Sequence, residues 1–142
     1  MRSCYSVEEA EAEACLEGVR LTAEWVREPA IVEADCSTLI QSLVGTGQTR
    51  EGWRGIRQEI QAASELLPEC MFRKVSRNAN RVAHALAKRA MSKGEFVVKR
   101  FGYPPCVGSL VLLETPTDCG DPSSSDTGQL HNDAVCNAAV TN

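Results

Sequence analysis

Apolar residues recur at two spacings along this chain, one typical of helices and the other of strands. From Val7 to Val26 they return every three or four positions, which predicts an amphipathic helix. Short apolar runs between proline or polar residues predict buried strands instead. The expected elements are helices over 7–27, 37–43, 53–67 and 78–91 and strands over 30–34 and 71–75. This α-β-α-α-β-α order is typical of α/β proteins whose parallel strands are joined by crossover helices.

Capping residues mark the ends of these helices. Ser6 followed by Glu9 predicts a capping box at the start of the first helix. Asn78 is the expected cap of the last helix, and Gly94 is expected to end it. Trp53 opens the third helix, where we expect it to pack rather than to stack on a base.

The periodic signal fades in the last third of the chain. The stretch 96–113 is predicted to add a strand-like or packing segment. Residues 115–142 are rich in Pro, Ser, Asp, Gly and Asn and contain no aromatic residue, which predicts a disordered tail. The expected organisation is therefore one domain over 1–114 followed by this tail.

The overall charge conceals an uneven distribution. The 142 residues carry a net charge of −4, and the first 35 residues are acid-rich. Between 73 and 100 the only acidic residue is Glu95, and the basic residues are Arg73, Lys74, Arg77, Arg81, Lys88, Arg89, Lys93, Lys99 and Arg100. A basic stretch of this kind can attract a polyanion whatever the total charge.

Other features argue against several classes of protein. The apolar runs are too short to span a bilayer, and no apolar core follows Met1 as in a secretory signal. The seven cysteines are scattered without a C-x-x-C pair, which disfavours a zinc site and favours reduced thiols. We therefore expect an intracellular protein, in the nucleus or cytoplasm, without membrane attachment.

Three segments carry a resemblance to a known family. Residues 10–21 read AEAEACLEGVRL, residues 31–43 read IVEADCSTLIQSL and residues 77–87 read RNANRVAHALA. Together and in this order they resemble the plant ribonuclease H-like (reverse-transcriptase-like, RNase H type-1) domain family, over about residues 4–91.

The resemblance implies a five-stranded mixed sheet with helices on both faces. Three antiparallel strands open the family fold, and the helix that matches the family's first helix begins here near residue 7. Two strands are too few for an independent sheet. The chain is therefore expected to be an N-terminally truncated, partial ribonuclease H-like fold, the C-terminal two-thirds of the whole.

The resemblance also implies a chemistry. Family members cleave the RNA strand of RNA–DNA hybrids with two Mg²⁺ ions held by four acidic positions, the first of them on the opening strand. Glu11 and Asp35 match the second and third positions and are the candidate catalytic residues and metal ligands. His84 stands at the fourth position, and Lys74 replaces a loop histidine. Imidazole is a poor Mg²⁺ ligand, so Mg²⁺ binding is expected to be weak or absent and catalysis impaired.

A hybrid or another nucleic acid is the expected partner. Lys74, Arg77, Asn80 and Arg81 are the candidate binding residues, because such side chains meet phosphates and 2′-hydroxyls. Simpler interpretations remain open: the acidic position on the first helix as part of a solvated face, Asp35 as a helix cap, and the basic stretch as a solvated surface.

Three functions are compatible with these residues. The first is a ribonuclease H-like hydrolase domain, derived from a retroelement, that binds an RNA–DNA hybrid but is impaired in hydrolysing its RNA strand. The second is a nucleic-acid-binding module without catalysis. The third is a protein-interaction module that completes its sheet with another chain, or a gene-model fragment.

Overall fold

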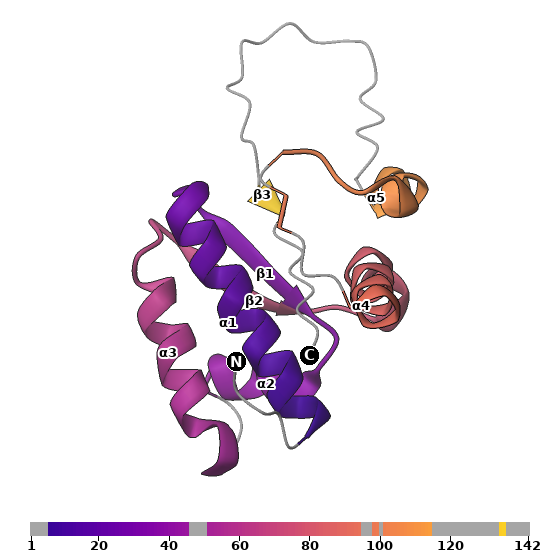
Figure 1. Ribbon diagram of the computed structural model, residues 1–142. Helices are drawn as coiled ribbons and strands as arrows, with labels where there is room; N and C mark the ends of the chain where they lie inside the picture. Colours follow the sequence, from indigo (N-terminus) through magenta and orange to yellow (C-terminus); the bar gives the residue numbers. More distant parts are fainter. Residues whose placement is uncertain (1–5, 46–50, 95–97, 100, 115–133, 136–142) are drawn as a thin grey trace, which may run out of the picture.

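Parallel strands alternate with helices in the computed structural model (Figure 1), as the sequence predicts. The structure describes residues 6–45, 51–94, 98–99, 101–114 and 134–135. The helices are α1 (Val7–Trp25), α2 (Ser37–Leu43), α3 (Arg54–Ser64), α4 (Arg81–Lys93) and α5 (Gly108–Glu114). The strands are β1 (Ala30–Ala34), β2 (Cys70–Lys74) and β3 (Ala134–Val135), and the short 3-10 turns are η1 (Glu51–Trp53), η2 (Arg77–Ala79) and η3 (Pro105–Val107). The α/β class and the partial ribonuclease H-like architecture are confirmed.

The two ends of α1 show how local sequence sets its length. At the start, the Ser6 side chain accepts a hydrogen bond from the Glu9 backbone N–H at 3.2 Å, as the capping signal predicts. The helix ends at Trp25 rather than at the expected Arg27. Arg27 adopts a left-handed conformation with φ of 58°, and its N–H donates to the Thr22 carbonyl at 3.0 Å. A left-handed residue of this kind ends a helix and turns the chain toward the next strand.

The sheet is built on one parallel pair. β1 and β2 pair from Ala30 with Cys70 to Ala34 with Lys74, and the Val75 N–H extends the ladder to the Ala34 carbonyl at 3.0 Å. The strand order is β2-β1-β3, with both residues of β3 parallel to the start of β1. The rest of the expected tail over 115–142 lies outside the described residues.

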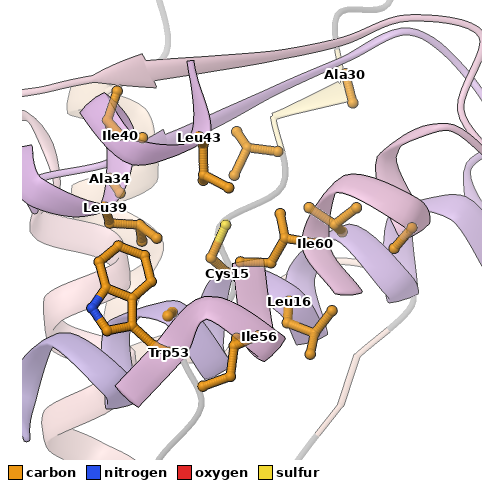
Figure 2. Close-up of a cluster of buried hydrophobic side chains, with 14 of the residues drawn as sticks. Cys15, Leu16, Ala30, Ala34, Leu39, Ile40, Leu43, Trp53, Ile56 and Ile60 are labelled. Atoms are coloured by element: carbon orange, nitrogen blue, oxygen red, sulfur yellow. The ribbon is translucent and has the colours of Figure 1, made fainter. Parts of the chain in front are cut away.

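One hydrophobic cluster joins α1, α2 and α3 to the strands (Figure 2). The strand β1 alternates buried and half-buried residues, so Ala30, Val32 and Ala34 enter the cluster. Trp53 is only 2% exposed and packs in the same cluster, which confirms its expected packing role. We call the elements α1, β1, α2, α3 and β2 the core.

The remaining helices form a smaller unit, which we call the flank: α4, η3 and α5. These elements contact one another, and Figure 1 shows α4 and α5 lying apart from α1 and α3. Among the described flank side chains, Val82 and Val107 are buried. For the stretch 96–113, expected to be a strand-like or packing segment, the described part favours the packing alternative, because Gly108–Glu114 is helical and packs on α4.

The start of α4 also corrects an expectation. Asn78 lies inside η2, which is capped by the Ser76 side chain accepting from the Ala79 N–H at 3.3 Å. The N-cap of α4 is Asn80, and its side chain makes no capping bond. Gly94 ends the helix in a left-handed conformation, as expected.

Two further findings bear on the expected class of protein. No described helix combines the length and the apolar character that crossing a membrane requires. The cysteines within the described ranges, Cys15, Cys36, Cys70 and Cys106, are free thiols.

Candidate functional site

Asp35 lies at the carboxyl end of β1, directly after the last buried residue of the strand. Its side chain is 19% exposed and both of its oxygens are engaged. Oδ2 accepts from the Arg77 Nε at 3.2 Å, and Oδ1 accepts from the Asn80 Nδ2 at 3.3 Å. The Asn80 side chain, which makes no capping bond to α4, therefore donates its amide to Asp35.

The parallel pairing of the strands brings these residues together. β2 ends at Lys74, in register with Ala34, so the chain leaves both strands at the same edge of the sheet. The turn η2 then places Arg77 and Asn80 over Asp35 before α4 begins. The site is therefore assembled where the core meets the flank.

Glu11, in the first half of α1, shares this electrostatic environment. Its partial burial raises the pKa of its carboxyl above the ordinary value, and the negative charge of Asp35 raises it further. Arg77 and His84 act in the opposite direction and lower the pKa of Glu11. The two candidate carboxylates are thus close enough to interact, with Arg77 and His84 near them.

The other candidate binding residues are exposed and lie close to Arg77 and Asn80 along the chain. Lys74 is exposed at the end of β2, and Arg81 is exposed at the first position of α4. His84 is exposed one turn further along α4, and its backbone N–H donates to the Asn80 carbonyl at 3.2 Å. Of the binding set named from the sequence, Arg77 and Asn80 thus contact Asp35, Lys74 is in register with Ala34, and Arg81 directly follows Asn80.

The sequence analysis missed the acidic partners of the basic stretch. Arg73 forms an ion pair with Glu33, its register partner on β1, and Arg77 forms one with Asp35. Each pair joins residues about 40 positions apart along the sequence. Only the register of the two strands could have revealed these partners, because acids from β1 meet bases from β2 and the turn after it.

The residues present do not fit a two-metal centre. Among the residues that the structure describes, no group of three or more His, Cys, Asp or Glu side chains is arranged to hold a metal ion. Asp35 already accepts from a guanidinium and an amide, and a nearby cation disfavours a divalent ion. His84 offers an imidazole where Mg²⁺ prefers oxygen.

Comparison with known proteins adds one finding about ancestry. A family model described as reverse transcriptase-like matches residues 1–90, which is more than half of the chain. No curated protein and no solved structure gives a significant match. The match includes α1, both paired strands and most of α4, and so contains every residue of the candidate site.

Proposed function

The chain belongs to the reverse transcriptase-like family of RNase H-like domains, and on that premise we propose that it binds RNA–DNA hybrids and is impaired in cleaving their RNA strand. The observation that carries the proposal is the contact of Arg77 and Asn80 with Asp35, next to the exposed Lys74 at the end of β2 and the exposed Arg81 at the start of α4. Guanidinium and ammonium groups meet phosphates, and an amide can meet a 2′-hydroxyl.

Impairment is proposed from the residues at the site. Glu11 and Asp35 are two carboxylates that can interact, and the position that the family resemblance assigns to a further acid holds His84. Lys74 stands where the resemblance implies a histidine, and an exposed ammonium is a poor proton carrier near neutral pH. Binding without efficient hydrolysis is the function these side chains favour.

A cleavage assay tests the impairment. We expect a labelled RNA–DNA hybrid to remain intact when it is incubated with the protein and Mg²⁺. Robust cutting that Asp35→Asn abolishes would contradict this expectation and would assign Asp35 to a working catalytic centre.

A filter-binding titration at rising salt tests the binding. We expect affinity for the hybrid to fall steeply with salt, and Arg81→Gln to reduce the slope of log K against log [salt] by about 1. Arg54→Gln is the matched control, because Arg54 is likewise exposed at the first position of a helix, α3, but belongs to the core. If the protein has no affinity for the hybrid, or if its affinity does not change with salt concentration, the proposed function is wrong.

A second candidate function is a protein-interaction module, and one observation favours it. In the described residues β3 pairs only with Ala30 and Ile31, so the rest of that edge of β1 has no strand partner there. An open edge can pair with a strand from another chain. Size-exclusion chromatography separates the two candidates: a concentration-independent monomer argues against completion of the sheet by a second copy.

The free thiols also support residence in a reducing compartment, and we propose the nucleus or cytoplasm. Fractionation of cells that express the full chain tests this assignment. Recovery of the protein from a secreted fraction would contradict it.

A further inference from the structure

We propose that the Arg77 guanidinium supplies the positive charge that a metal ion would supply beside Asp35. The domain would then bind the phosphate backbone of an RNA–DNA hybrid without a divalent metal. This inference rests on the proposed function and adds to it the metal independence and the residue responsible. It begins from the disagreement between the family's metal chemistry and the contacts of Asp35.

The first step is the state of Asp35. Mg²⁺ is bound through carboxylate oxygens, and a cation already paired with the carboxylate opposes the ion by charge repulsion. Here the Arg77 Nε donates to Oδ2 at 3.2 Å and the Asn80 Nδ2 donates to Oδ1 at 3.3 Å. Arg77 therefore balances the charge of Asp35 directly, and Mg²⁺ would have to approach a positive guanidinium to reach the same carboxylate.

The second step is the exposure of Arg77. Its side chain is 86% exposed, whereas that of Asp35 is 19% exposed. The bond to Asp35 uses only Nε, and a guanidinium has four further N–H donors on its two terminal nitrogens. Those donors can form the two parallel bonds to a phosphate for which arginine is suited. Asp35 thus holds the Nε side of the guanidinium, while the N–H groups on the two terminal nitrogens remain open to a ligand.

The third step is the local balance of charge. Arg77 acts on both carboxylates, on Asp35 through a hydrogen bond and on Glu11 through its charge. Lys74 and Arg81 are exposed nearby along the chain, at the end of β2 and at the start of α4. Exposed basic side chains of this kind can attract a phosphate even though the whole chain carries a net charge of −4.

The test measures binding with and without metal. Fluorescence anisotropy follows a labelled RNA–DNA hybrid titrated with the full-length chain, in Mg²⁺ and in EDTA at matched ionic strength. We expect the wild-type protein to bind in EDTA at least as tightly as in Mg²⁺. We expect Arg77→Gln to weaken binding in EDTA by about tenfold, as for loss of an arginine contact, and Mg²⁺ to restore part of that affinity.

Three further variants make the result specific. Arg77→Lys keeps the positive charge but loses the paired N–H donors of the guanidinium, so its affinity in EDTA should fall between those of the wild type and Arg77→Gln. Asp35→Asn combined with Arg77→Gln should show no restoration by Mg²⁺, because the carboxylate that could hold the ion is gone. Arg54→Gln should bind as the wild type does. Circular dichroism confirms that each variant is folded, which the exposure of Arg77 favours.

The outcomes separate this inference from the proposed function. Wild-type binding that requires Mg²⁺ would overturn the inference and leave the proposed function standing. Unchanged binding by Arg77→Gln in EDTA would also overturn it. Absence of binding in both buffers would remove the proposed function, and the inference with it.

Discussion

The core and the flank are held together in different ways, and the candidate site lies where they meet. In the core, α1, β1, α2 and α3 share one cluster of buried side chains. In the described part of the flank, Val82 and Val107 are the buried apolar residues, and α4 packs chiefly on η3 and α5. The carboxylates Glu11 and Asp35 belong to the core side of the site.

The candidate site joins residues from the two sides of this boundary. Asp35 follows the end of a core strand, whereas Asn80 is the N-cap of α4, which packs chiefly on η3 and α5. The hydrogen bonds of Arg77 and Asn80 to Asp35 tie the segment just before α4 to the end of a core strand. A ligand that engages Arg77 would act at this joint, while the core remains unchanged.

The largest effect is expected from a core substitution. Leu16 is 1% exposed within the buried cluster, and Leu16→Ala should lower the free energy of unfolding by about 2–5 kcal/mol. Leu86 is half-buried on α4, so the matched Leu86→Ala change should have a clearly smaller effect. Urea denaturation of both variants measures the difference. Equal losses would contradict the division into a core and a weaker flank.

A smaller effect is expected from a buried position in the flank. Val82 is 5% exposed, and Val82→Ala should cost about 1–2 kcal/mol, the value of two buried methyl groups. Because α4 contacts the core weakly, the loss should appear as faster hydrogen exchange in α4 with little change in α1. Equal acceleration in both helices would indicate a single cooperative unit.

A modest, pH-dependent effect is expected at Glu11. Its pKa is raised first by burial and then by Asp35, so the folded protein holds this proton more tightly than the unfolded chain does. Ionisation of Glu11 therefore lowers the free energy of unfolding. This loss is absent below the pKa that Glu11 has in the unfolded chain, grows as the pH rises toward the raised pKa of the folded protein, and is complete above it. Glu11→Gln should be more stable than the wild type at neutral pH and lose this advantage on acidification.

Thermal unfolding across pH checks this prediction. Glu24→Gln is the control, because Glu24 is exposed on the same helix. An advantage of Glu11→Gln that persists in acid would mean that its cause is packing and not the charge of the carboxylate.

The smallest effect concerns thiol reactivity and leaves the fold intact. Burial raises the pKa of the Cys15 thiol to about 12, whereas Cys106 is exposed on η3 in the flank. At about pH 8 a thiol with that pKa is ionised in only about one molecule in ten thousand, and the thiolate is the reactive form. Mass spectrometry after alkylation should find Cys106 modified in the native protein and Cys15 modified only on unfolding. Rapid labelling of native Cys15 would contradict its place in the core.

The sequence predicted most of the core because its signals are local. The spacing of Ala12, Cys15 and Val19 matches one face of a helix, and these residues are buried as expected. The short run 30–34 predicted β1 with the observed bounds. The family resemblance drew attention to Glu11 and Asp35, which the structure places within each other's electrostatic influence. Their catalytic and metal-binding roles stay predictions.

The features that the sequence did not predict depend on contacts between distant residues. The cap expected at Asn78 was wrong because Asn78 lies inside η2, which Ser76 caps, and α4 begins only after Asn80, whose side chain donates to Asp35, 45 positions away. The helix α5 was missed because its apolar run, Leu110 to Leu113, is too short to show a period. The ion pair of Arg77 with Asp35 likewise required the register of the two strands.

Nuclear magnetic resonance of the side-chain nitrogens tests the central claim most directly. A ¹⁵N-labelled protein would be titrated with a short RNA–DNA hybrid in EDTA, with the Arg77 Nε–H, the Asn80 amide and the Arg54 Nε–H followed together. We predict that the Arg77 and Asn80 signals shift as the hybrid is added, while that of Arg54 stays in place. Binding that leaves Arg77 and Asn80 unshifted and perturbs only other residues would contradict the account.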